Sequence, residues 1–165
     1  MKTRRITTMA LLTAVALILF TVEAQIPPPV PIPGVKLGLA NIITVYAMFA
    51  LGPMDALCIL LARVLLGSMF SGAMITLLYS LSGGLLCWLV MLPLRRILTK
   101  QQIWVCGVLG AVAHNVGQTL AAIAVFRTLA VAAYFPLLVL SGILAGLFTG
   151  LCAQFVVSRA HLTEW

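Results

Sequence analysis

Long runs of apolar residues, separated by a few short polar segments, dominate this chain. From them we expect six apolar helices, over residues 6–22, 37–51, 54–70, 73–92, 103–126 and 134–157. A run of about 20 apolar residues is long enough to cross the hydrocarbon core of a bilayer as a helix. The pattern therefore predicts an all-α integral membrane protein, a bundle of six transmembrane helices that forms a single domain over residues 1–165.

Two interruptions set the expected helix boundaries. The segment 23–36 holds five of the eight prolines, so it cannot be helical, and we expect it to be extended and packed on the protein. The apolar stretch 37–70 is too long for one span. The pair Gly52-Pro53 breaks helices near its middle, and Asp55 follows at once. We therefore divide this stretch into two short spans.

The distribution of basic residues supports that division. Basic residues are enriched in the cytoplasmic loops of membrane proteins. Three groups flank the expected spans: Lys2, Arg4 and Arg5 before the first, Arg95, Arg96 and Lys100 after the fourth, and Arg159 after the sixth. The first two groups lie on the same side of the membrane if the chain crosses it an even number of times between them. The third group lies on that side too if two more crossings follow. Six spans satisfy this condition, with both termini in the cytoplasm and the Pro-rich segment outside.

Composition excludes a soluble fold. Hydrophobic residues make up 63% of the chain and charged residues 8%, with a mean hydropathy of +1.20. In a soluble protein the net charge of +7 would suggest a nucleic-acid partner, but here the basic residues cluster at span ends and we expect none. We also expect no metal site, because the four cysteines fall in apolar segments without the spacing of metal ligands and are best explained as small buried side chains: Cys58, Cys87, Cys106 and Cys152.

The informative residues are the polar ones inside the apolar runs. Polar groups within a membrane are costly and usually face a cavity or a partner. In the fifth span, His114 and Gln118 are four residues apart and Asn115 lies between them, so the three form one polar stripe. The other candidates lie in the outer half of the protein or at similar depth in the fourth span: Glu23, Lys36, Asn41, Arg63, Tyr79, Ser80 and Ser82.

Two interpretations of these residues stay open. In the first, Arg63 pairs with Glu23 and the stripe of the fifth span hydrogen-bonds between helices. In the second, the groups line an outward-opening pocket roofed by the Pro-rich segment, suited to an anionic or amphipathic ligand. We favour the pocket, because many polar groups converge and Arg63 and Lys36 exceed the single carboxylate of Glu23.

Catalysis has little support in the sequence. No nucleophile accompanies His114, no carboxylate pair or Asp-rich motif could hold Mg²⁺ for a diphosphate, and no Walker motif is present. We expect no catalytic residue and no cofactor. Any active transport would take its energy from another subunit. Ala10 and Ala14 form a small-residue pair on the first helix, near its cytoplasmic end, where a partner helix could dock.

Four motifs resemble a known family of small bacterial membrane proteins. They are PGVKLGLANI (33–42), ARVLLGS (62–68), YSLSGG (79–84) and GAVAHNVGQ (110–118). They occur in order and span most of the chain. The family is called the Gx transporters, and it is also known as component I of heptaprenyl diphosphate synthase. It is similar to the substrate-binding S-components of energy-coupling-factor transporters.

This resemblance implies two functions of different classes. As an S-component-like protein of the bacterial cytoplasmic membrane, the chain would capture a small or amphipathic solute from outside, in a site under the segment between the first two helices. It would work with a coupling transmembrane subunit, which Ala10 and Ala14 would contact, and with ATPases. Alternatively, it would be a non-catalytic membrane subunit in polyprenyl diphosphate or quinone metabolism, or in a flavin- or quinone-linked redox system, with a prenyl synthase or a flavoprotein as partner. Its three acidic residues argue against a prenyl synthase active site: Glu23, Asp55 and Glu164.

Overall fold

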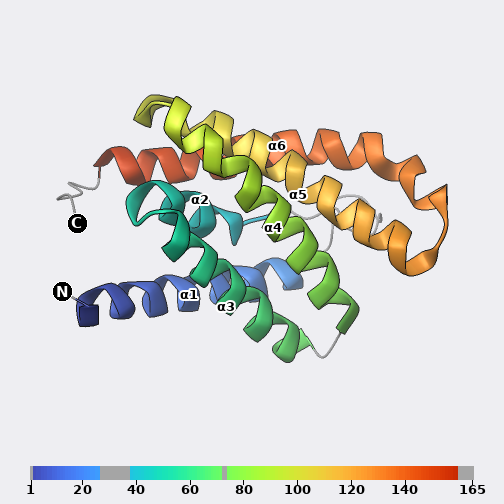
Figure 1. The fold of residues 1–165 in the computed structure, drawn as a ribbon, viewed down its shortest axis with the longest axis horizontal. Coiled ribbons are helices and arrows are strands. Elements are labelled where there is room, and N and C mark those ends of the chain that lie inside the picture. Colours follow the sequence, from blue (N-terminus) through green and yellow to red (C-terminus); the bar gives the residue numbers. More distant parts are fainter. Residues whose placement is uncertain (1, 27–37, 72–73, 160–165) are drawn as a thin grey trace.

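The computed structural model describes residues 2–26, 38–71 and 74–159, and within them the chain is helical (Figure 1). No strand occurs in these residues, so the predicted all-α fold is confirmed. Short 3₁₀ segments, η1 (Lys100–Gln102) and η2 (Leu129–Tyr134), precede the last two of six α-helices: α1 (Lys2–Gln25), α2 (Asn41–Ala50), α3 (Pro53–Ser71), α4 (Met74–Ile97), α5 (Ile103–Phe126) and α6 (Phe135–Arg159).

Five of these helices, all except α2, are long and apolar enough to cross a membrane. All five carry large exposed apolar side chains. In water such a surface would aggregate, but it matches a bilayer. The chain is therefore a multi-pass membrane protein.

Helix α2 is shorter than the sequence predicts. We expected a span over 37–51, but the helix begins at Asn41 and has 10 residues. At 1.5 Å per residue it is about 15 Å long, roughly half the thickness of the hydrocarbon core. Gly38 lies at a φ of +69°, a left-handed conformation that interrupts a helix, and residues 39–40 form a turn.

The predicted break between α2 and α3 is present. Gly52 lies at a φ of +121° and its N–H bonds back to the carbonyl of Ala47, closing the end of α2. Pro53 then begins α3, where a missing N–H has no cost. On α2 itself Val45, Ala47 and Met48 are buried, so this helix forms the centre of the apolar core.

The start of α1 and the start of α3 lie at the same end of the bundle. The guanidinium of Arg5 donates to both carboxylate oxygens of Asp55, with Nη2–Oδ1 at 2.6 Å and Nε–Oδ2 at 2.8 Å. The indole Nε1 of Trp88, late in α4, donates to the carbonyl of Pro53 at 2.9 Å. We call this the Asp55 end of the bundle. The last turn of α4, with Arg95 and Arg96, therefore lies towards the same end as Arg5.

The last two helices also run in opposite directions. The backbone N–H of Trp104, at the start of α5, donates to the side-chain oxygen of Gln154, late in α6, at 3.2 Å. Helix α6 therefore ends where α5 begins, at the Asp55 end, as Figure 1 shows. We call the opposite end, where α1 finishes, the Glu23 end. The three basic groups named from the sequence thus gather at one end, whereas Arg127, which follows α5, lies towards the other end.

Glycines allow two very close helix contacts. A Cβ placed on Gly107 of α5 would lie 2.5 Å from the Cα of Gly150 on α6, and one on Gly146 would lie 2.7 Å from the carbonyl oxygen of Gly107. On the other side of α5, a Cβ on Gly117 would lie 2.6 Å from the carbonyl oxygen of Ser82 on α4. Without a strong hydrophobic force between helices in lipid, such close backbone packing is a main source of association. The glycines of α5 and α6 thus serve packing within the chain.

Candidate functional site

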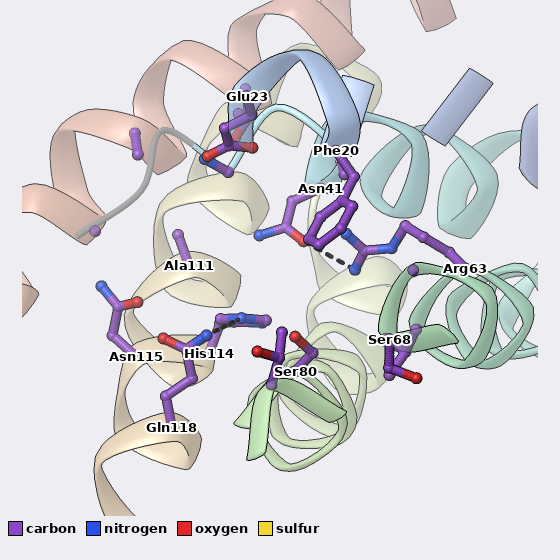
Figure 2. Close-up of a pocket in the computed structure, with 18 residues that line it drawn as sticks. Phe20, Glu23, Asn41, Arg63, Ser68, Ser80, Ala111, His114, Asn115 and Gln118 are labelled. Atoms are coloured by element: carbon purple, nitrogen blue, oxygen red, sulfur yellow. Dashed lines mark hydrogen bonds between the residues drawn. The ribbon is translucent and has the colours of Figure 1, made fainter. Parts of the chain in front are cut away.

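A polar cavity lies between the helices, in the half of the bundle towards the Glu23 end (Figure 2). Its volume is about 80 Å³. All six helices contribute to its wall, as does the turn before α2. Its polar lining comprises Glu23, Asn41, Arg63, Ser68, Thr76, Ser80, His114, Asn115, Gln118 and Thr149.

Arg63 supplies the guanidinium among the described residues that line the cavity. It lies on α3 and is only 8% exposed. Its Nη2 donates to the side-chain oxygen of Asn41 at 3.4 Å, a long and weak hydrogen bond, and its Nε has no hydrogen-bond partner among the described residues. Buried guanidinium groups normally have a carboxylate or several acceptors around them. The hydrogen-bonding capacity of Arg63 is therefore largely unused.

Glu23 is held by the backbone rather than by Arg63. Its carboxylate accepts the N–H of Gly38 at 2.6 Å and the N–H of Leu39 at 3.0 Å. Both amides precede the first turn of α2, where a negative charge is favourable because of the helix dipole. No salt bridge joins Glu23 to Arg63, so the pairing considered from the sequence is not formed. Glu23 instead fixes the point at which α2 begins.

The polar stripe of α5 forms the other wall of the cavity. His114 and Gln118 contact each other through His114 Nε2 and Gln118 Nε2 at 3.1 Å. Asn115 donates from Nδ2 to the carbonyl of Leu138 on α6 at 2.6 Å, which leaves its side-chain oxygen able to accept. A Cβ on Gly83 of α4 would lie 2.9 Å from both His114 Nε2 and Gln118 Cγ, so the missing side chain of this glycine makes room for the pair.

Seven of the ten ligand-binding candidates from the sequence line this cavity, namely Glu23, Asn41, Arg63, Ser80, His114, Asn115 and Gln118. Tyr79 and Ser82 do not. Ser82 hydrogen-bonds to its own helix, to the carbonyls of Leu78 and Tyr79. Each residue in a helix is rotated by about 100° from the previous one, so neighbours of Ser80 point elsewhere. Lys36 and most of the Pro-rich segment lie outside the described residues.

The sequence reasoning missed several residues of the wall. Thr76 precedes Ser80 by four residues and Gly67 follows Arg63 by four, so helical periodicity alone could have identified both. Phe20 of α1 and Thr149 of α6 also line the cavity. They carry no such signal, because only the packing of α1 and α6 against the other helices brings them to it.

The two docking candidates lie on the outer face of α1. Ala10 and Ala14 are both exposed. Among the described helices α1 contacts only α2 and α3, which leaves its opposite face towards the surroundings.

The described residues contain no group of three His, Cys, Asp or Glu side chains that could hold a metal ion. Cys87 and Cys106 are buried in the core, as the sequence suggests, whereas Cys58 is exposed and Cys152 is half-buried. The thiol of Cys87 lies 3.4 Å from the sulfur of Met91 on the next turn. This contact is part of the apolar packing around α2.

Comparison with known proteins identifies the family. The profile of the heptaprenyl diphosphate synthase component I family matches residues 12–156, which is most of the chain. Neither a curated protein nor a solved structure gives a significant match. The match includes every residue that lines the cavity, and it agrees with the resemblance carried by the four sequence motifs. The chain therefore belongs to the heptaprenyl diphosphate synthase component I family.

Proposed function

We propose that this protein is a membrane-embedded binding subunit that captures a small or amphipathic solute in the cavity around Arg63. One observation carries the proposal. A guanidinium that is almost fully buried faces a polar cavity, with one weak hydrogen bond and no salt bridge to Glu23. A charged side chain at the centre of a membrane helix costs roughly 2.5–3.5 kcal/mol on insertion scales. A polar or anionic group of a ligand would offset that cost.

We further propose that the protein works as an S-component does, together with a coupling subunit and ATPases. The exposed face of α1 around Ala10 and Ala14 supports this idea, because small residues let a partner helix approach closely. The absence of a Walker motif from the sequence means that the energy for uptake would come from those partners. The native setting would be the cytoplasmic membrane of a bacterium.

The family name favours a second candidate function, that of a non-catalytic membrane subunit of a prenyl diphosphate synthase or of a related quinone-linked system. In this case the partner would supply the chemistry. The sequence favours an accessory role, because it has three acidic residues and no Asp-rich motif that could bind Mg²⁺ for a diphosphate.

One experiment separates the two functions. The protein is purified from its native membranes under mild conditions, and native mass spectrometry identifies both the bound small molecule and the partner proteins. We expect a bound solute and recovery with coupling ATPases. Recovery with a prenyl synthase or a flavoprotein would favour the accessory role. A protein that is always empty, with no thermal shift from vitamins, flavins, prenyl phosphates or quinones, would count against solute capture.

The orientation of the bundle gives a separate prediction. The gathering of basic residues at the Asp55 end supports a cytoplasmic position for that end, with both termini inside. A reporter fused after Lys100 should then behave as cytoplasmic, and a reporter inserted at Val30 as external. The opposite result at either position would remove the even-crossing argument and displace Lys36 from the outer face.

A further inference from the structure

The guanidinium of Arg63 indicates which group of a ligand the cavity receives, an inference that rests on the proposed binding function. We propose that the ligand carries an oxyanion with two oxygen atoms side by side, a carboxylate or a phosphate group. This oxyanion binds the Nε–Nη2 edge of Arg63 and replaces the side chain of Asn41 there. It belongs either to a small free anion or to the headgroup of an amphiphile.

The ion pair at the Asp55 end shows how this protein binds a carboxylate with the same edge of an arginine. Arg5 donates from Nε and Nη2 to the two carboxylate oxygens of Asp55, at 2.8 Å and 2.6 Å. Two parallel charge-assisted bonds of this kind are stronger than bonds between neutral groups, and they fix the orientation of both partners. Arg63 has the same pair of donors on its own edge.

The edge of Arg63 is almost unoccupied. Its Nε has no hydrogen-bond partner among the described residues, and its Nη2 donates to the side-chain oxygen of Asn41 at 3.4 Å. The residue is only 8% exposed, so water compensates little of its charge. The side chain of Arg5 is 61% exposed and yet has a bidentate partner. The more deeply buried of the two arginines thus lacks, within the described residues, the carboxylate that the exposed one has.

The acidic residues of the chain do not supply this carboxylate. Both oxygens of Glu23 accept backbone N–H groups before α2, and turning Glu23 towards Arg63 would leave these buried amides without an acceptor. The segment 27–37, outside the described residues, contains no acidic residue. The remaining one, Glu164, follows α6 in the sequence, and α6 finishes at the Asp55 end. A ligand is therefore the natural source of an anion for Arg63.

The position of Asn41 leaves this edge open to exchange. Figure 2 shows the guanidinium of Arg63 extending from α3 towards the cavity, where the side chain of Asn41 meets it. A hydrogen bond of 3.4 Å is weak, so the side chain of Asn41 can move aside at little cost. Its amide nitrogen is a donor, which suits it to hydrogen-bond an anion that has taken its place.

The volume limits the part of the ligand that enters. The cavity of about 80 Å³ is far smaller than the roughly 300–1,000 Å³ of pockets that enclose drug-sized molecules. It therefore receives the ionic group and the atoms next to it. The rest of a larger ligand, such as the chain of an amphiphile, would extend beyond the cavity.

The first test needs no ligand. Asn41→Asp places a carboxylate beside Arg63 in almost the same shape as the native amide. We expect this variant to raise the unfolding temperature of the full chain in detergent by about 4 °C, because the new carboxylate forms the missing charge pair. The matched control is Gln101→Glu, which adds the same charge at an exposed position outside the cavity and should leave the unfolding temperature unchanged.

A double-mutant cycle shows whether Arg63 causes this gain. The first turn of α2 favours a negative charge by itself, so Asn41→Asp is also introduced into a chain that carries Arg63→Gln. In that chain it should lower the unfolding temperature, because the buried carboxylate no longer has the guanidinium beside it. A gain that persists without Arg63 would come from another source, such as the helix terminus, and would overturn the proposal. A loss of stability in Asn41→Asp alone would overturn it too.

The second test measures binding to the full chain by titration calorimetry and thermal shift at constant ionic strength. The probes are acetate, inorganic phosphate, decanoate and decyl phosphate, with chloride and 1-decanol as controls. We expect saturable binding of at least one of the four oxyanions and of neither control. Tighter binding of a decyl compound than of the matching free anion would identify an amphiphile headgroup, and equal binding would identify a small free anion.

The same variants connect binding to the edge of Arg63. Asn41→Asp should weaken the binding of the preferred oxyanion at least about tenfold, because its own carboxylate occupies the edge. Gln101→Glu should bind as the parent protein does. Unchanged binding to Asn41→Asp, or binding of none of the four oxyanions to the parent, would overturn the assignment.

Failure of this inference is distinguishable from failure of the proposed function. A neutral molecule that co-purifies with the protein would overturn the oxyanion class but leave solute capture intact. A protein that is always empty after purification, but whose Asn41→Asp variant is stabilised only when Arg63 is present, would count against solute capture while supporting an anion site at Arg63.

Discussion

Replacing Gly107 with leucine should separate α5 from α6 and lower the free energy of unfolding by about 3 kcal/mol or more. A Cβ at this position would lie 2.5 Å from the Cα of Gly150 and 2.6 Å from the carbonyl oxygen of Gly146. Both atoms belong to the backbone of α6, so no side-chain rotation can relieve the overlap. The helices would have to move apart, and the close packing that holds them together in lipid would be lost.

The measurement is the temperature at which the protein in detergent loses its monodisperse elution profile. The matched control is Ala124→Leu, which places the same side chain on an exposed position of α5. We expect the control to behave as the parent protein, and Gly107→Leu to aggregate or to unfold well below the parent temperature. An unchanged unfolding temperature for Gly107→Leu would show that α5 and α6 do not approach as closely as described.

Much of the helical framework could be predicted from the sequence, because membrane helices leave two strong signals. Long apolar runs indicate the spans, and helix-breaking pairs such as Gly52-Pro53 indicate where a run divides. The arrangement of Arg5 and Arg95 at one end follows from the enrichment of basic residues on one side of a membrane. These signals are local, and no tertiary contact is needed to interpret them.

The length of α2 could not be predicted in the same way. Residues 37–51 are as apolar as the other spans, yet the helix starts only at Asn41. A tertiary contact contributes to this late start, because the carboxylate of Glu23, fifteen residues earlier than Gly38, binds the amides that precede the helix. The local composition of the segment does not indicate such a contact.

The residue types of the candidate site could be predicted, but the hydrogen-bond partners of its side chains could not. Polar residues in apolar helices are few, so most of those chosen from the sequence line the cavity. Tyr79 and Ser82 do not line the cavity, since residues adjacent in sequence do not share a helix face. The partner of Glu23 was also not predictable. Counting charges favours Arg63, whereas the structure gives Glu23 two backbone amides, which are invisible in a sequence.

Because Glu23 and Arg63 lie in different environments, we expect their replacement to have different effects on the free energy of unfolding. Glu23→Ala should lower the free energy of unfolding by about 2–4 kcal/mol, because it leaves the N–H groups of Gly38 and Leu39 without their acceptor. Arg63→Met should leave the stability of the ligand-free protein unchanged or raise it by about 1 kcal/mol. It keeps the length of the side chain and removes a buried charge that has little compensation.

Chemical unfolding of the ligand-free protein in mixed micelles would measure both changes. Glu23→Gln serves as an intermediate control. It keeps an oxygen that can accept one of the two N–H groups but loses the charge, so its effect should lie between those of the parent and Glu23→Ala. If Arg63→Met were as destabilising as Glu23→Ala, the two charges would be supporting each other in the folded protein. Arg63 would then be structural, and a ligand anion would no longer be needed to explain a buried guanidinium beside the polar cavity.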